Sequence, residues 1–225
     1  MGMGGPWAIR MQHLRRRMIT DHLLTLSQWL SPAYPVGSFA WSHGLENAIA
    51  AGQVRDADSL QDWLWVALAK GSGCSDAILL CAAYRGEDVA DLAAALAPSR
   101  ERLMETLQQG AAFAATTRAV WGLDLQGAAY PVAVGRAAGL IGLPAVATAQ
   151  LFLFSFASAL TQAAQRLMPL GQTKAQQVLA DLAPLCQSLG QEAATLTVDD
   201  IGSCTFAIDI AAMRHEVQEP RMFRS

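Results

Sequence analysis

The chain of 225 residues carries a formal net charge of −3, with 52% hydrophobic and 16% charged residues. This mildly acidic balance argues against nucleic acid as the main partner, because binding to a phosphate backbone rests on clustered positive charge. A chain of this length can bury a core without a disulfide or a structural metal, and no Pro/Gly/Ser-rich linker or charge block divides it, so we expect one domain.

The first 17 residues differ from the rest of the chain. Arg10 and the run of Arg15, Arg16 and Arg17 make this segment basic. The arginines are not followed by an apolar run and a small-residue cleavage site, so the pattern is not that of a secretory signal. We expect residues 1–17 to form a flexible basic extension, or an addition that is absent in the cell, and residues 18–225 to form one helical domain.

Apolar residues recur at helical spacing from residue 21 onward, and almost no segment alternates as a strand does. Ser59 followed by Asp62 resembles a capping box that begins a helix, and Gly71 and Gly73 predict a break after it. Pro184 predicts a bend. The sequence therefore predicts an all-α fold, a single globular domain of about seven to ten helices. The expected helices span residues 21–30, 39–51, 59 to the glycine pair, 76–84, 88–97, 98–121, 130–140, 144–168 and 173–196.

A long uncharged stretch lies between Ala137 and Gln165, where the sequence has no Asp, Glu, Lys, Arg or His. As one helix it would exceed the roughly 30 Å of a bilayer's hydrocarbon core, so a membrane span is one interpretation. Pro144 breaks the stretch, and polar residues recur after it, which favours a helix at the centre of the domain or in a dimer interface. The residues expected at the middle of that core or interface are Leu151, Phe152, Phe154 and Phe156.

Residues 31–46, SPAYPVGSFAWSHGLE, are the least generic part of the chain. Pro32 and Pro35 disfavour helix at the residues before them, and Gly37 allows a turn. Ser38 is suited to cap a following helix that carries Phe39, Trp41, His43 and Glu46. Two interpretations remain open: a recognition surface at a shaped helix start, or a helix–loop–helix corner whose aromatic residues pack inward.

The last residues, RMFRS, alternate charged and apolar side chains. Composition and position predict a tail, about residues 217–225, that is disordered in the isolated chain and orders on a partner. Phe223 would then be the apolar anchor, and Arg221 and Arg224 would supply charge-assisted hydrogen bonds. We expect removal of the last residues to abolish partner binding while leaving the fold intact.

Catalytic motifs are not evident. Lys70 and Lys174 lack the glycine of a phosphate-binding loop, and no GxSxG elbow is present. His215 and Glu216 begin an HExxH-like pattern, but Glu219 stands where the second histidine would be. We predict that the chain is not an enzyme and needs no cofactor or metal. A metal-dependent hydrolase assembled from His43, His215 and Asp200 remains an alternative of a different class.

The cysteines, Cys74, Cys81, Cys186 and Cys204, form no CxxC pair. Their scatter is typical of free thiols in the reducing cytoplasm. Cys74 and Cys81 are spaced to share a helix face, which leaves a soft-metal site as an alternative to ordinary buried side chains.

Four blocks together resemble the UreF family of urease accessory proteins: SPAYPVGSFAWSHGLE, RLMPLGQ at 166–172, DDIGS at 199–203 and the terminal RHEVQEPRMFRS. Their order and spacing match those of the family, and the resemblance covers residues 18–225. Many relatives carry a histidine just before the proline matched by Pro131, where this chain has Tyr130, so a metal role there is in doubt. The resemblance implies a helical, usually dimeric, cytoplasmic assembly factor.

The resemblance further implies that the protein joins an accessory protein that binds apo-urease and that the two recruit a nickel-carrying GTPase. It leaves open whether nickel passes through the protein and which surface meets the GTPase. A helical scaffold protein outside urease maturation is the main alternative. The partner-contact positions carried over by the resemblance are Tyr34, Pro35, Gly37, Phe39, His43, Glu46, Arg166, Pro169, Gly171, Gln172, Asp200, Gly202, Ser203, His215, Gln218, Arg221, Phe223, Arg224 and Ser225.

Overall fold

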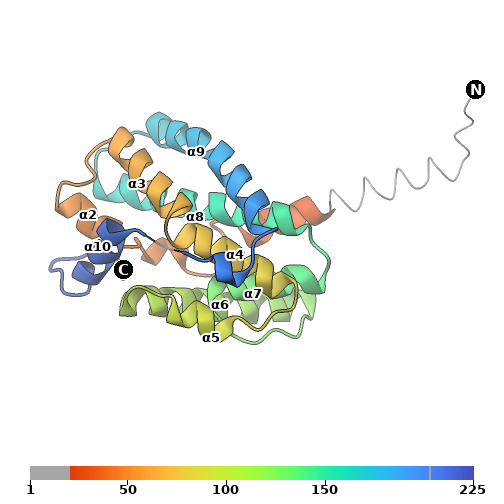
Figure 1. Ribbon diagram of the computed structural model, residues 1–225. Coiled ribbons are helices and arrows are strands. Elements are labelled where there is room, and N and C mark those ends of the chain that lie inside the picture. Colours follow the sequence, from red (N-terminus) through yellow and green to blue (C-terminus); the bar gives the residue numbers. More distant parts are fainter. Residues whose placement is uncertain (1–20, 203) are drawn as a thin grey trace, which may run out of the picture.

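The computed structural model describes residues 21–202 and 204–225, and within these ranges the regular secondary structure is helical (Figure 1). The predicted basic extension, residues 1–17, and Ser203 lie outside the described residues. A helical segment covers residues 21–29. The elements that follow are η1 (Ser38–Ala40), α2 (Leu45–Ala50), α3 (Ala57–Ala69), α4 (Ser72–Tyr84), α5 (Ala90–Ala95), α6 (Arg100–Trp121), α7 (Tyr130–Leu140), α8 (Ala145–Leu167), α9 (Gln172–Ala193), η2 (Val198–Asp200) and α10 (Phe206–His215).

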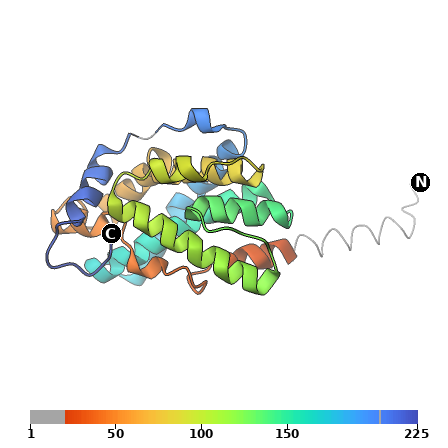
Figure 2. The same ribbon diagram turned by 90° about the horizontal axis from the view of Figure 1, so that it is seen from below.

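Helix α4 lies at the centre of the domain. It packs against α3, α8 and α9 on one side and against α7 on the other, and α6 in turn covers α7 (Figures 1 and 2). The approach of α7 is close because Gly135 has no side chain: a Cβ there would collide with the Leu80 carbonyl of α4. Every residue of α4 from Ala77 to Ala83 is buried, as expected of a helix segment that is apolar all round.

An aromatic cluster joins the N-terminal segment to α6. Trp29 meets Phe113 edge to face, with ring centroids 5.3 Å apart. The Tyr34 hydroxyl pairs with that of Thr117 at 2.7 Å, so its polar end is satisfied inside the core. Short elements gather at one end of the domain, where α2 lies against α10 and the chain ends (Figure 1).

The predicted all-α class is confirmed, and most helix boundaries fall within a few residues of the prediction. The predicted helix 39–51 is wrong, because His43 and Gly44 both adopt positive φ and separate the 3-10 turn from α2. Helix α3 begins earlier than predicted: Asp56 is its N-cap and accepts from the Ser59 amide, while the Ser59 hydroxyl accepts from the Asp56 amide. The break at the glycine pair is present, with α4 beginning at Ser72.

Two helical stretches, Ala57–Tyr84 and Ala145–Leu167, are long and apolar enough to cross a membrane by length and composition alone. This is weak evidence, because core helices of globular domains share these properties, and the first stretch is divided into α3 and α4. Helix α8 is more open: Phe152 and Leu153 are buried, whereas Leu151, Phe154 and Phe156 are only partly buried. The prediction of a core position therefore holds for Phe152 and only in part for its neighbours.

Candidate functional site

The segment of residues 31–46 turns most of its side chains inward. Tyr34, His43 and Glu46 are buried, while Pro35 and Phe39 are exposed, Phe39 by 74%. Gly37 has a φ of 75°, which supplies the left-handed turn before η1. The inward-packed corner therefore describes this segment better than a fully exposed recognition surface, with Phe39 as the clear exception.

A tight turn at His43 and Gly44 aims Glu46 at the C-terminal segment. Their φ values are 58° and 76°, and a positive φ at a non-glycine residue such as His43 is uncommon. Gly44 also allows α10 to approach, because a Cβ at this position would lie 2.7 Å from the Ala212 nitrogen. Helix α2 therefore begins directly against α10, with the Glu46 carboxylate at the centre of the contact.

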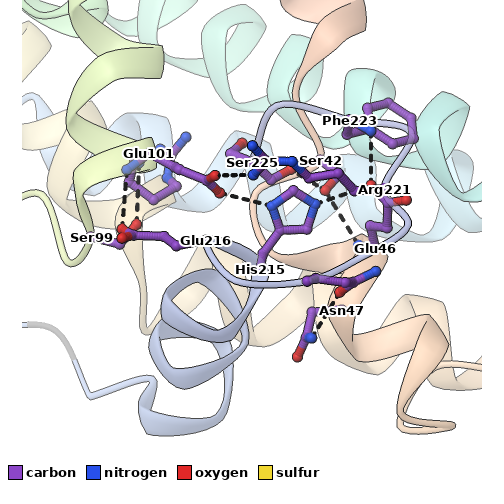
Figure 3. A network of polar contacts seen from close by, with 12 residues as sticks. Ser42, Glu46, Asn47, Ser99, Glu101, His215, Glu216, Arg221, Phe223 and Ser225 are labelled. Atoms are coloured by element: carbon purple, nitrogen blue, oxygen red, sulfur yellow. Dashed lines mark hydrogen bonds and ion pairs between the residues drawn. The ribbon is translucent and has the colours of Figure 1, made fainter.

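Glu46 holds the tail through two backbone hydrogen bonds and also contacts His215 at the end of α10 (Figure 3). Its carboxylate accepts from the amides of Met222 at 2.6 Å and Phe223 at 2.8 Å, and its Oε2 lies 3.0 Å from His215 Nε2. Burial pushes the pKa of Glu46 upward, but the hydrogen bonds from Met222, His215 and Phe223 outweigh it and lower the pKa. The ionised carboxylate is thus the form that the fold selects.

His215 lies between two carboxylates and is fully buried. Its Nδ1 is 2.7 Å from Glu101 Oε2, opposite the contact of Nε2 with Glu46. A doubly protonated imidazolium satisfies both contacts with N–H donors. Glu101 also accepts from Arg221 at 2.5 Å, so its carboxylate contacts both the His215 ring and a guanidinium. Buried ions require such pairing, because an unpaired charge in this position would be costly.

The last residue is also held inside the domain. Ser225 is fully buried, and its main-chain oxygen accepts from the Ser42 amide at 2.8 Å and from the Ser42 hydroxyl. Its hydroxyl donates to Glu105 at 2.9 Å, and Glu105 pairs with Arg102. The tail therefore connects the 31–46 segment with the first turns of α6.

The second block meets the tail through Arg166. Its guanidinium lies 4.3 Å from the centre of the Phe223 ring and donates to the Phe39 carbonyl at 2.6 Å. Phe223 itself is buried at 3% exposure. Arg224 is exposed and lies over Trp41, 5.2 Å from the ring centre. Three sequence blocks, 31–46, 166–172 and 214–225, thus meet the first turns of α6 at one site, which we call the tail seat.

The expectation of a disordered tail is wrong for this structure. Phe223 and Ser225 are buried, and Glu46 and Ser42 bind the tail backbone. The companion expectation, that removing the last residues leaves the fold intact, stays a prediction, and the contacts argue against it because removal would take the tail partners from Glu46 and Glu105. Gln218 is also held, because Asn47 donates to its side-chain oxygen at 2.8 Å.

Other predicted positions do not join the tail seat. Pro169 and Gly171 are exposed in the connection between α8 and α9, and Gln172 is exposed at the first position of α9. Asp200 accepts from the Thr197 amide and hydroxyl within η2, which lowers its pKa. Gly202 is exposed next to it.

The predicted alternative sites of metal chemistry are not assembled. His43 Nε2 pairs with the Ser72 hydroxyl at 2.7 Å, whereas His215 is enclosed by Glu46 and Glu101, so these two histidines and Asp200 have separate partners. Within residues 21–202 and 204–225, no three His, Cys, Asp or Glu side chains are placed to hold a metal ion, which includes the region of Cys74 and Cys81. Burial raises the pKa of Cys81 to about 11.

Several residues of the tail seat were not foreseen: Ser42, Glu101, Arg102, Glu105 and Glu216. Glu216 caps α6 by accepting from the Arg100 amide at 2.8 Å. In sequence, residues 99–105 resemble the solvated first turns of an ordinary amphipathic helix, so no local signal distinguishes these charges as buried. Helix α10, which carries His215, was also missed.

Comparisons with known proteins agree with the family resemblance. The family model described as UreF matches residues 54–183. A urease accessory protein UreF of Cereibacter sphaeroides (strain KD131) is 54% identical over 206 residues, which cover 90% of this chain and 98% of that protein. Proteins of the same name from Ruegeria pomeroyi and Roseobacter denitrificans are 48% and 50% identical and cover 90% and 92% of this chain and 96% of their own length in each case. The chain belongs to the UreF family of urease accessory proteins.

Proposed function

We propose that this chain acts in urease maturation as a non-catalytic assembly factor. In this role it bridges an accessory protein that binds apo-urease and a nickel-carrying GTPase during nickel insertion, and it regulates the GTPase. It works in the cytoplasm as a homodimer and needs no cofactor of its own. The names of its relatives support the general role, since these are urease accessory proteins. The bridging role rests on the surfaces described next.

The observation that carries this proposal is an exposed apolar face next to the tail seat. Phe206, Ile210, Met213 and Val217 recur at spacings of four and three, so they form one face of α10 and its extension. Their exposed fractions are 75%, 44%, 51% and 83%. We call this face the α10 stripe. A contiguous apolar face of this kind beside charged groups is typical of a protein-binding surface.

Contacts within the tail seat hold the end of α10, and therefore the α10 stripe, in a fixed position. Helix α10 ends at His215, whose ring is locked between Glu46 and Glu101, and the tail that follows presents Met222 at 58% exposure. A rigid support lowers the entropy that a partner must remove on binding. We therefore assign the binding of the partner accessory protein to the α10 stripe together with the outward side chains of the tail.

A second surface suits the homodimer. The open face of α8 carries Leu151, Phe154, Ser155 and Ser158. It borders a groove of about 420 Å³ whose other walls are formed by residues 26–41 and by side chains of α4, α6 and the start of α7. The absence of charged residues from Ala137 to Gln165 suits a face that is covered by a second copy, since interface cores are depleted of charge. Ser158→Glu should shift the protein towards monomer in light scattering. An unchanged dimer would exclude this face.

The bridging role is tested by the double variant Met213→Asp with Val217→Asp. Both side chains are exposed, so the fold should persist, which circular dichroism checks. We expect co-purification with the other accessory proteins to be lost, and urease in a host carrying the variant to remain low in nickel and activity. Val120→Asp, which puts the same charge at an exposed apolar position near the C-terminal end of α6, is the matched control. Normal assembly and full urease activity with the double variant would refute the assignment.

A further inference from the structure

A second, polar cavity lies between α4, α5, α6 and α10. Its volume is about 150 Å³, which is room for a few water molecules or one small solute. The polar side chains that line it are His43, Ser72, Ser75, Asp76, Arg102, Thr106, Thr205 and Asp209. The remaining wall is Leu, Ala, Pro and Ile, so the polar groups face a small, partly open space with apolar sides.

Two of these side chains carry buried atoms without a hydrogen-bond partner from the part of the chain that the structure describes. They are His43 Nδ1 and Arg102 Nε, in residues that are 3% and 6% exposed. Leaving such a group unpaired costs about 1–3 kcal/mol, so native structures rarely tolerate it. Two of them in the walls of one cavity indicate that the cavity is built to hold a polar partner.

Asp76 is the third group that faces this space. It is half-buried and lines both this cavity and the groove beside α8. Burial raises the pKa of its carboxyl to about 7, against the attraction of Arg102 and with a smaller contribution from Glu105. Hydrogen bonds from the described part of the chain do not contribute to this pKa, which leaves the carboxyl able to bond to a ligand.

The charges around the cavity restrict what it can bind. Arg102 is already paired with Glu105, and the carboxyls of Asp76 and Asp209 oppose a second anion. Burial, and to a lesser extent Arg102, hold the pKa of His43 well below its usual range, so its ring is neutral. A cation would face Arg102, and residues 21–202 and 204–225 place no three metal ligands together. These groups suit a neutral molecule that offers both an acceptor and N–H donors.

We propose that this cavity is a binding site for a small uncharged molecule of the primary-amide or urea class. The ligand's carbonyl oxygen accepts from Arg102 Nε, and its N–H groups donate to the Asp76 carboxyl and to His43 Nδ1. This places the ring proton of His43 on Nε2, where it donates to the Ser72 hydroxyl at 2.7 Å. The three groups that the protein leaves without partners are then all satisfied.

The test is protein-observed NMR on the full chain with labelled histidine side chains, titrated with acetamide and with urea at millimolar, non-denaturing concentrations. We expect saturable shifts of the His43 ring signals with both probes. Asp76→Leu removes the acceptor without cutting a hydrogen bond within the protein, and it should weaken binding by roughly tenfold or more. Asp91→Leu, at an exposed position on α5, is the control and should bind as the wild type does.

The proposal is overturned if the His43 signals do not saturate, if Asp76→Leu binds as well as the wild type, or if glycine binds in place of the amides. The first result would mean that the cavity holds water only. Because the isolated protein is titrated without its partners, the outcome is independent of the proposed role in urease maturation.

Discussion

Glu46→Gln is the sharpest test of how the tail is held. The substitution keeps the size of the side chain but leaves one oxygen where the carboxylate has two. An amide oxygen placed at Oε2 still accepts from Phe223 and His215, but the amide nitrogen then faces the Met222 N–H, donor against donor. Because Glu46 is only 6% exposed, water cannot replace the lost partner. Loss of one charged hydrogen bond and of the carboxylate charge beside His215 should cost about 3 kcal/mol.

Native-state hydrogen exchange measures this loss directly. The amides of Met222 and Phe223 should exchange roughly 100-fold faster in Glu46→Gln, since about 1.4 kcal/mol corresponds to each factor of ten. Amides at the centre of α4, far from the tail seat, should change much less if the tail opens locally. Glu219→Gln changes an exposed carboxylate in the same segment and should leave all rates unchanged. Equal protection of the tail amides in Glu46→Gln and wild type would show that the carboxylate does not hold the tail.

Three further changes test neighbouring contacts. Phe223→Ala should destabilise the docked tail by about 3 kcal/mol and speed limited proteolysis after residue 217, whereas Met222→Ser, at an exposed position, should not. Gly44→Ala should lower the free energy of urea unfolding by at least about 2 kcal/mol, because it combines a positive φ with a clash against the backbone of Ala212. Asp76→Asn should stabilise the protein above pH 7. The folded pKa of Asp76, about 7, lies above its unfolded value of 3.8, so its penalty is absent below about pH 4 and complete above about pH 7, where it reaches at most about 4 kcal/mol.

Other charged and titratable groups lie close to Asp76 and also affect how the stability of wild type and Asp76→Asn depends on pH. Arg102 favours the ionised carboxyl and Glu105 opposes it, while His43 and Asp209 line the same cavity. Unfolding curves of wild type and Asp76→Asn, measured in parallel from pH 4.5 to pH 8, cancel the other titrating groups. Curves that stay a constant distance apart at all these pH values would mean that Asp76 is ionised throughout.

Local signals predicted most of the helices. Ser99 caps α6, and Gly122 ends it with a φ of 68°, so both boundaries were readable from residue types alone. Errors arose where tertiary contacts override local preference. The residues His43 and Gly44 interrupt the predicted helix 39–51 because α10 must approach Gly44, and α10 itself is too weakly patterned and too exposed to stand out as a core helix.

The docked position of the tail could not be predicted from its own composition, again because tertiary contacts decide it. Its partners, Ser42, Glu46, Glu101 and Glu105, lie more than 100 residues away in the sequence. A segment of five residues buries too little apolar surface to dock unaided, so its order depends on polar partners that the rest of the fold has already placed. The family resemblance marked both the 31–46 segment and the terminal segment as characteristic of the family. Only the structure shows that these two segments contact each other.

The alternation of the last residues has a physical meaning once the tail is docked. Phe223 and Ser225 point into the domain, while Met222 and Arg224 point outward, as successive side chains of an extended segment do. The inward pair therefore acts through the fold, and the outward pair is available to a partner. Deleting the whole tail removes both kinds of contact and cannot separate them. Substitutions at the outward positions alone leave Glu46 and Glu105 satisfied, so a loss of partner binding in such variants would report on the contact itself.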